Sequence, residues 1–239
     1  MSVLLQTKGL TKRFQGLVAT EDVDFTLNAG EVRSVIGPNG AGKTTFISMI
    51  SGHLRPTSGT ITFKGEDITR QSLPVRANHG IVRKFQTPSV FTGLSVHQNI
   101  ELAVIASRIP PRQHAARVAE VIDLVRLTPQ ADTLASALSH GQRQWLEIGL
   151  LLGAQAQLLL LDEPTAGMTA EETHATGVLI NRLTQELNLS AIIIEHDINF
   201  IESLKAPITV LHLGRVFREG AFAEISADPD VRNIYLGTD

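Results

Sequence analysis

The sequence contains no cysteine in its 239 residues. A disulfide scaffold and a thiol nucleophile are therefore excluded, and this composition suits a reducing cytosol. Charge of one sign is also lacking, because 21 Lys and Arg stand against 24 Asp and Glu and the formal net charge is only −3. A nucleic acid is therefore not the expected partner, since such a partner requires a broad basic field.

Long hydrophobic runs are missing as well. An apolar run such as Leu158–Leu161 has the length of a strand, and none approaches the ~20 residues that a membrane helix needs. The first residues, Met1–Lys8, do not form the apolar core of a signal peptide. We therefore expect a soluble chain of one large domain, long enough to bury most of its apolar surface. If it works at a membrane, other chains span it.

A glycine-rich stretch near residue 40 fits the phosphate-binding pattern G-x-x-x-x-G-K-[ST] without a mismatch. It follows an expected strand at 31–36 and precedes a helix whose apolar face ends at Ser51-Gly52. Glycines let backbone N–H groups turn toward phosphate oxygens, and the helix N-terminus adds partial positive charge. The predicted phosphate site comprises Gly37, Pro38, Asn39, Gly40, Ala41, Gly42, Lys43, Thr44 and Thr45. Lys43 supplies a full positive charge there, and the Thr44 hydroxyl can hold Mg²⁺.

The order of apolar patterns predicts the fold class. Short alternating runs at 3–7, 23–27 and 60–63 predict a small antiparallel sheet. A segment of helical pattern from about 96 to 153 follows, and then strand, helix and strand at 158–161, 171–187 and 191–194. A third apolar strand at 208–213 leads into a short polar helical tail. We expect an α/β fold with an antiparallel β subdomain and a helical insertion.

Two predicted strands end in residues that suit phosphate chemistry. Asp162 and Glu163 follow Leu158–Leu161, so they would lie at the carboxyl edge of the sheet, where α/β folds bind ligands. Asp162 could reach Mg²⁺ through water, and Glu163 could polarise a water for attack on a γ-phosphate. The alternative is a surface or capping pair before a helix. His196 follows Ile192–Ile194 in the same way and could donate to γ-phosphate oxygens, or be structural.

The segment Leu138-Ser139-His140-Gly141-Gln142 is similar to the L-S-G-G-Q signature of ABC-type ATPases. The resemblance extends from the phosphate loop through Gln86, the signature and the Asp-Glu strand to His196. It implies a P-loop NTPase core and one ABC ATPase domain over 1–239. The core would comprise about 1–86 and 155–239, and a helical subdomain with the signature about 87–154.

The resemblance implies that two such domains pair head to tail with two MgATP between them. Each ATP would contact the phosphate loop of one chain and Ser139, Gly141 and Gln142 of the other. The resemblance implies that the loop, including Gly42 and Lys43, binds the nucleotide. It implies that Thr44 and Gln86 bind Mg²⁺ directly and that Asp162 binds it through water. Glu163 would be the general base, and His196 would contact the γ-phosphate. Phe14 matches an aromatic that stacks on adenine; its alternative is a core phenylalanine.

Three positions depart from the family pattern. His140 stands where the signature normally has glycine, and Thr169 where the loop after Asp-Glu-Pro-Thr normally ends in aspartate. The helix after the signature reads Glu147-Ile148-Gly149, where Ala-Arg-Ala is usual. These departures leave the strength of coupling across the pair open.

The stretches Arg83–Phe91, Gln144–Glu147 and Ala166–Thr169 resemble the ATP-binding subunit of urea importers, a group related to branched-chain amino-acid importers. This resemblance implies that the chain works with two transmembrane permease subunits and with a second ATP-binding subunit, which is the same or a sister chain. A solute-binding protein would be an indirect partner. The chain would lie peripherally on the cytoplasmic face of the inner membrane. Urea or a related amide is the expected cargo. Alternatives are branched-chain amino acids, or a soluble ABC ATPase such as one for iron–sulfur assembly. We expect Thr87–Leu94 to dock a membrane subunit, with Val90 and Phe91 as its apolar part unless they pack the insertion.

Overall fold

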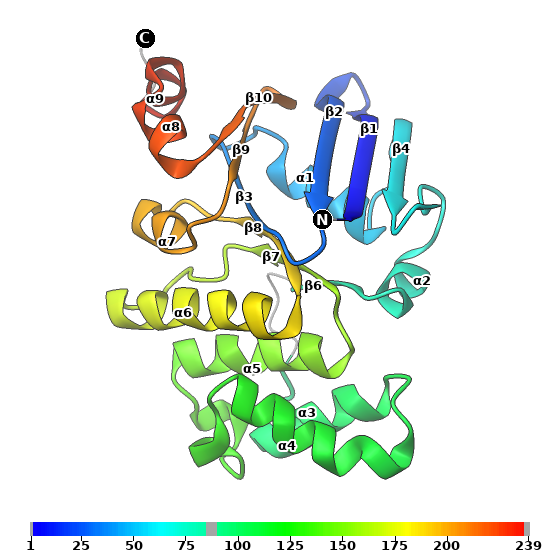
Figure 1. The fold of residues 1–239 in the computed structure, drawn as a ribbon, viewed down its shortest axis with the longest axis vertical. Coiled ribbons are helices and arrows are strands. Elements are labelled where there is room, and N and C mark those ends of the chain that lie inside the picture. Colours follow the sequence, from blue (N-terminus) through cyan, green and yellow to red (C-terminus); the bar gives the residue numbers. More distant parts are fainter. Residues whose placement is uncertain (1, 85–89, 237–239) are drawn as a thin grey trace.

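The computed structural model describes residues 2–84 and 90–236, and its centre is a six-stranded sheet (Figure 1). The strand order is β10-β9-β3-β8-β7-β6. Five strands are parallel and β10 pairs antiparallel with β9 at one edge. Their bounds are β3 Val32–Ile36, β6 Ile81–Arg83, β7 Leu158–Asp162, β8 Ser190–Ile194, β9 Ile208–His212 and β10 Arg215–Gly220. The phosphate-loop strand β3 therefore lies in the interior of the sheet.

The central strands are apolar throughout because both faces of the sheet are covered. Leu158 and Leu160 of β7 pack with α1 (Lys43–Ser51) and the antiparallel sheet. Leu159 and Leu161 point to the other face, into the cluster formed by the helices. One short strand thus joins two hydrophobic clusters, which fixes its register.

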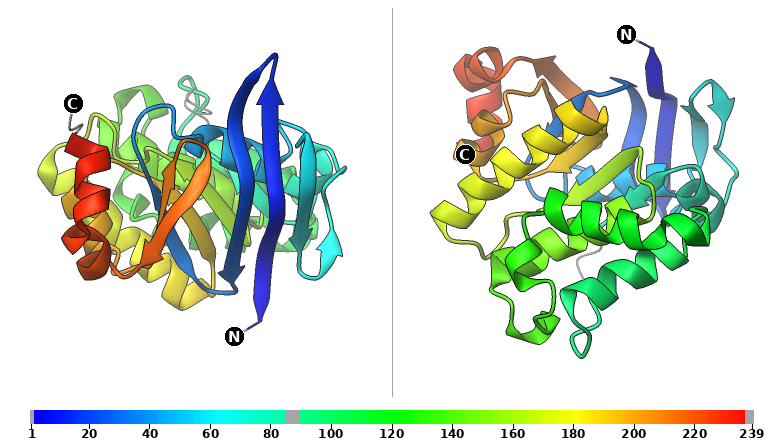
Figure 2. Two further views of the ribbon diagram at one scale, coloured as in Figure 1. Left: turned by 90° about the horizontal axis from the view of Figure 1, so that it is seen from above. Right: turned by 60° about the horizontal axis from the view of Figure 1, so that its bottom comes forward.

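The antiparallel sheet has the order β2-β1-β4-β5. Its strands are β1 Val3–Phe14, β2 Leu17–Asn28, β4 Ser58–Phe63 and β5 Glu66–Asp67. Figure 2 (left) shows β1 and β2 side by side along their whole length. The sheet is the predicted one, but β1 and β2 are longer than predicted. Register shifts near Gly9, whose φ is 59°, interrupt the alternation on which the shorter prediction rested.

Three helices gather at one end of the molecule (Figure 1). They are α3 Val96–Ile105, α4 His114–Leu124 and α5 His140–Gly153. The predicted apolar face of α4 is correct, since Val118, Val121 and Ile122 are all buried. The break predicted at Pro110-Pro111 separates α3 from α4, and three short 3-10 segments fill the connections (Pro111–Gln113, Thr128–Gln130 and Ala135–Ala137). Beside α5 lies α6, Ala170–Leu187.

Four elements were not predicted: α2 (Leu73–Asn78), α7 (Ile198–Ser203), β5 and β10. Each has at most six residues, too few for a periodic pattern to stand out. The predicted helical tail is present as α8 Phe222–Ala227 and α9 Pro229–Leu236. Among the described residues, no helix is both long and apolar enough to cross a bilayer.

Candidate functional site

A cavity of about 360 Å³ opens where the strands β3, β7 and β8 end. It brings together the phosphate loop, the turn of the β1–β2 hairpin, and the residues that follow β7 and β8. Its lining is Phe14, Leu17, Val18, Ala19, Asn39, Gly40, Ala41, Gly42, Lys43, Thr44, Thr45, Glu163, Ile194 and His196. The carboxyl edge of the sheet is therefore the place where the predicted residues from four distant segments meet.

Two glycines allow the loop to adopt its shape. Gly37 and Gly42 have φ of 148° and 97°, values that other residues rarely adopt. A Cβ at Gly37 would clash with the Leu211 carbonyl oxygen, and one at Gly42 with the Ala19 carbonyl oxygen. The loop is thus packed tightly against both sheets.

The first turn of α1 faces the cavity. Gly42 is its N-cap residue, and no side chain caps the helix N-terminus. The first N–H groups of a helix have no partner within it, and together they form a preferred position for an anion. Lys43, Thr44 and Thr45 at this turn all line the cavity.

Lys43 lies on the inner side of the loop and is 7% exposed. Its Nζ donates to the carbonyl oxygens of Gly37 at 2.6 Å and Pro38 at 3.0 Å. Burial lowers the pKa of Lys43, while the nearby carboxylates of Glu163 and Asp162 oppose that shift. The loop thereby holds a cation close to the uncapped N-terminus of α1 and to two acidic residues.

Asp162 ends β7 and is 4% exposed, so it is neither a surface residue nor a helix cap. Arg83 Nη2 lies 3.1 Å from its Oδ2, and Arg83 Nη1 donates to Ser48 Oγ at 2.7 Å. The other oxygen, Oδ1, is buried and has no hydrogen-bond partner within the described part of the chain. This oxygen and the exposed Thr44 hydroxyl of α1 are both oxygen donors of the kind that Mg²⁺ prefers. Gln86, the other predicted ligand, lies outside the described residues.

Glu163 and His196 are brought together at the mouth of the cavity. His196 Nε2 lies 3.5 Å from Glu163 Oε1, and both side chains are partly exposed. Glu163 has φ of 49°, a left-handed conformation that is costly for a residue with a side chain. Its N–H donates to the Ile194 carbonyl at 2.9 Å, which fixes this backbone against β8.

A third carboxylate, Glu195, supports this pair, and the sequence analysis missed its role. Glu195 is buried and accepts hydrogen bonds from the Thr165 N–H at 2.8 Å and the Thr165 hydroxyl at 2.5 Å. Its other oxygen accepts from the His196 N–H at 3.0 Å. Glu195 therefore joins the loop after Glu163 to the start of the His196 segment. Its place in Ile194-Glu195-His196, at the end of a buried strand, was the available signal.

Phe14 is 40% exposed and lines the cavity, so the alternative of a core phenylalanine is wrong. Lys12 Nζ lies 5.0 Å from the ring centroid. The ring is therefore a partly exposed aromatic surface at the end of the cavity formed by the β1–β2 hairpin, with the Lys12 ammonium group over it.

The signature residues do not line this cavity. Ser139 is the N-cap residue of α5, and Gln142 completes a capping box with it. The Ser139 hydroxyl and the Gly141 N–H both donate to Glu172 Oε1, each at 3.1 Å. The predicted donors are present at the helix N-terminus, but within one chain they contact α6.

Each departure from the family pattern has a partner in the structure. His140 Nε2 donates to the Ala166 carbonyl at 2.9 Å. Thr169 is the N-cap residue of α6, with Glu172 as the other member of a capping box. Glu147 lies 3.4 Å from Lys84 Nζ, and both residues are buried. These contacts connect α5 to the loop before α6 and to the segment after β6.

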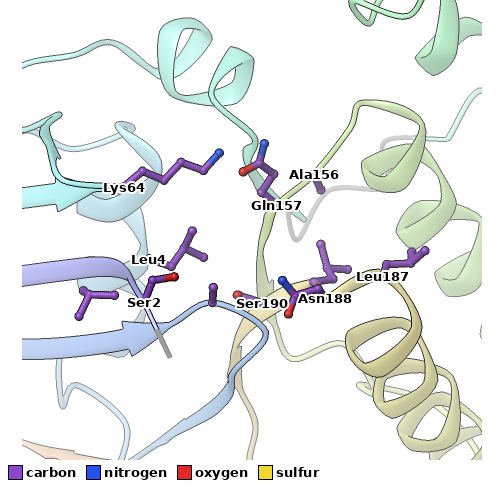
Figure 3. Close-up of a pocket in the computed structure, with 11 residues that line it drawn as sticks. Ser2, Leu4, Lys64, Ala156, Gln157, Leu187, Asn188 and Ser190 are labelled. Atoms are coloured by element: carbon purple, nitrogen blue, oxygen red, sulfur yellow. The ribbon is translucent and has the colours of Figure 1, made fainter.

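A second hollow, of about 550 Å³, lies at the amino ends of β7 and β8 (Figure 3). Gln157 and Ser190 border it beside Asn188, the C-cap residue of α6. Lys64 is the one charged side chain among its lining residues. Because ligands of α/β sheets bind at the carboxyl edge, the first cavity is the candidate site.

Comparison with known proteins agrees with this geometry. The family model described as ABC transporter matches residues 20–166. The branched-chain amino acid transport ATP-binding protein BraF of Pseudomonas aeruginosa is 35% identical, over 98% of both chains. The probable branched-chain amino acid transport ATP-binding protein LivG of Archaeoglobus fulgidus is 32% identical, over 98% of this chain and 95% of that protein.

Solved structures give the same result. The ADP conformation of MJ1267, an ATP-binding cassette of an ABC transporter, is 28% identical and superposes with a TM-score of 0.89 over all of both chains. The cbiO1 protein of Clostridium perfringens, 27% identical, superposes with a TM-score of 0.87 over 99% of this chain and 96% of that one. The predicted fold class is therefore confirmed. The chain belongs to the ABC transporter family and is an ATP-hydrolysing, nucleotide-binding subunit of that family.

Proposed function

We propose that this chain is the ATPase subunit of a bacterial importer, and that it binds MgATP in the cavity at the phosphate loop. The observation that carries the proposal is the convergence of Lys43, Glu163 and His196 on one cavity at the N-terminus of α1. The relatives that are named for branched-chain amino acid transport support the hypothesis that the chain is a subunit of an importer. The chain would lie peripherally on the cytoplasmic face of the membrane, with two permease subunits that span it.

In this proposal the loop N–H groups and Lys43 bind the β- and γ-phosphates. Phe14 stacks on adenine, and Glu163 accepts a proton from the attacking water. His196 would donate to a γ-phosphate oxygen. Its Nε2 lies 3.5 Å from Glu163 Oε1, and this proximity supports a base and a donor that act on the same phosphate. Mg²⁺, when bound, would stabilise charge on the phosphate oxygens, with Thr44, Gln86 and Asp162 holding it directly or through water.

The division of labour between two chains is part of the proposal. Ser139, Gly141 and Gln142 would bind the nucleotide that a partner holds, since they do not line the cavity of their own chain. The partner is a second copy or a sister ATPase. The helical subdomain at about 87–154 would carry these residues, between the two parts of the core at about 1–86 and 155–239.

The Glu163→Gln variant tests the catalytic assignment. It should bind ATP normally but turn over more slowly by on the order of 10²–10⁴-fold, because the amide cannot accept the proton. The control is Glu171→Gln, which removes an exposed carboxylate of α6. ATP binding and steady-state hydrolysis are measured for all three proteins. Normal turnover in Glu163→Gln would remove Glu163 as the base.

A docking surface for a membrane subunit is proposed at Phe91. Phe91 is 60% exposed, whereas Val90 is buried in the helical cluster, so the expectation for Val90 was wrong. The fully buried Asn99 binds both the N–H and the carbonyl of Phe91, at 2.9 and 3.0 Å. Phe91 is thus held outward by a fixed backbone. Residues 87–89 of the predicted segment lie outside the described residues.

Replacing Phe91 by serine should separate the chain from its membrane partners. We expect ATP binding by the isolated chain to be unchanged, because Phe91 does not line the nucleotide cavity. Co-purification with the permease subunits should fall. Val178→Ser, which removes an exposed apolar side chain of α6, is the control. Retention of the permeases by Phe91→Ser would place the docking surface elsewhere.

Two cargoes remain candidates. The relatives are named for branched-chain amino acid transport, which favours that class. Urea or a related amide is favoured by the resemblance of 83–91, 144–147 and 166–169. The alignment to BraF spans 251 positions, whereas this chain has 239 residues, so BraF contains residues that this chain lacks. This difference from a branched-chain amino acid relative also favours urea. Uptake of labelled leucine and urea by cells with and without the gene distinguishes them.

A further inference from the structure

Glu172, on the first turn of α6, binds two groups that the proposed function assigns to a nucleotide. Its Oε1 accepts hydrogen bonds from the Ser139 hydroxyl and the Gly141 N–H, each at 3.1 Å. Its Oε2 accepts from the Thr169 N–H at 3.1 Å and the Thr169 hydroxyl at 3.3 Å. Each carboxylate oxygen therefore has a separate task. One caps α6, and the other lies at the N-terminus of α5.

The contact is close and charged. A Cβ added at Gly141 would lie 2.8 Å from Glu172 Oε1, so only glycine lets the carboxylate approach this backbone. The hydrogen bond from the Thr169 N–H contributes most to lowering the pKa of Glu172. Burial opposes this shift, and the Gly141 N–H and the Ser139 hydroxyl each lower the pKa by a smaller amount. The side chain is thus an anion, bound where a helix N-terminus offers N–H groups.

We propose that Glu172 is a positioning residue that occupies the anion site of the signature in the unpaired chain, and that the γ-phosphate of a partner's nucleotide must displace it. This inference rests on the proposed function, in which Ser139 and Gly141 bind that phosphate. One N–H and one hydroxyl cannot serve a carboxylate and a phosphate oxygen at once. Two anions at one site also repel each other.

Displacement is sterically simple. Glu172 is partly exposed, so its Oε1 can rotate into water once a stronger anion arrives. The hydrogen bond from His140 to the Ala166 carbonyl is separate from Glu172 and still joins α5 to the loop before α6. The signature would therefore keep its place while its donors change partner. The chain therefore needs a higher ATP concentration, because only chains in which Glu172 has been displaced can bind the partner's nucleotide.

The isosteric variant Glu172→Gln separates the two tasks. Its amide oxygen can still accept from the Thr169 N–H, as glutamine does in capping boxes. The amide NH₂ would then face the Gly141 N–H and cannot accept from it. The control is Glu171→Gln, since Glu171 is an exposed carboxylate in the same helical turn. It removes the same charge and leaves the signature contact intact.

The first measurement is titration of each isolated chain with inorganic phosphate, followed through the Gly141 amide resonance. We expect phosphate to bind at Gly141 roughly tenfold more tightly in Glu172→Gln than in the wild type or Glu171→Gln, the scale of losing one charge-assisted hydrogen bond. Loss of a helix cap alone would not strengthen anion binding. Equal affinities in the three proteins, or no binding at Gly141 in any, would overturn the proposal.

The second measurement uses the complex with the membrane subunits in detergent. The ATP concentration for half-maximal hydrolysis should fall by roughly tenfold in Glu172→Gln and stay unchanged in Glu171→Gln. An unchanged or higher requirement in Glu172→Gln would overturn the proposal even if phosphate bound more tightly. If no such complex can be isolated, the proposed function fails, and the phosphate titration alone decides whether Glu172 competes with an anion.

Discussion

At the scale of single residues, the nucleotide cavity combines costly features that are each held by a neighbour. Glu163 has a left-handed backbone, and its N–H is fixed to Ile194. Lys43 is buried as a cation, and two loop carbonyls hold its ammonium group. Features of this kind lower stability and persist only where the surrounding structure compensates for them. They gather at functional sites.

Phe14→Ala should weaken ATP binding by roughly 1–2 kcal/mol, the scale of stacking between a base and an aromatic ring. The free energy of unfolding should change little, since the ring is 40% exposed. Calorimetric titration with ATP and urea unfolding of the same protein check this. Unchanged affinity in the folded variant would show that the ring does not contact adenine.

At the scale of elements, buried charges connect pieces of structure. Arg76 of α2 is fully buried and donates to the carbonyls of Met49 and Ile50, at the end of α1 that lies away from the phosphate loop. Burial lowers the pKa of Arg76 to about 10. A cation is favoured at a helix C-terminus, so α2 fixes the helix that carries Lys43.

The pair Lys84–Glu147 connects the segment after β6 to α5. Both residues are almost fully buried, at 6% and 5% exposure. Desolvation lowers the pKa of Lys84 below 10.5, and Glu147 is the main group that opposes the shift. Glu147→Gln should therefore leave a buried cation without its main counter-charge and lower the free energy of unfolding by about 3 kcal/mol. The double variant Lys84→Met with Glu147→Leu should recover most of that loss.

The pH dependence of this loss has a defined sign. In Glu147→Gln the pKa of Lys84 falls further below 10.5, the value in the unfolded chain. The penalty is fully present below the folded pKa and shrinks as the pH rises from it toward 10.5, because the folded protein then buries a neutral amine. Urea unfolding of the wild type and of Glu147→Gln, at pH about 7 and at pH about 9.5, measures the loss of unfolding free energy at each pH. A larger loss at the higher pH would contradict the assignment.

At the scale of the whole molecule, one chain carries two separate halves of the proposed nucleotide site. The cavity lies at the carboxyl edge of the six-stranded sheet, whereas the signature donors lie at the N-terminus of α5. The proposed function joins these halves between two chains, and it places the helical end of the molecule against the membrane subunits.

Purification of the tagged chain from native membranes in mild detergent tests that arrangement. We expect two polytopic membrane proteins and a second ATPase, identical or different, to accompany it. Exclusively soluble partners would contradict transport and favour a soluble ABC ATPase, such as one for iron–sulfur assembly. The nucleotide-binding cavity would be unaffected by that outcome.

The features that short-range chemistry controls could be predicted from the residues alone. The phosphate loop between strand and helix, the apolar strands 158–161 and 191–194, and Asp162 at a strand end all follow from patterns within about ten residues. Such patterns also placed His196 at the same sheet edge, since the carboxyl ends of parallel strands lie together. The family resemblance extended this to the signature.

The contacts between distant segments depend on how the whole chain packs, and no local pattern predicted them. Glu172 contacts Gly141 although the two residues are 31 positions apart, and no sequence pattern near either residue predicts this contact. Lys84 finds Glu147 only when α5 packs beside the segment after β6. The open face of Phe14 and the burial of Val90 likewise depend on what the rest of the chain covers. Local patterns set conformation, but packing sets which polar groups lose water and therefore must find partners.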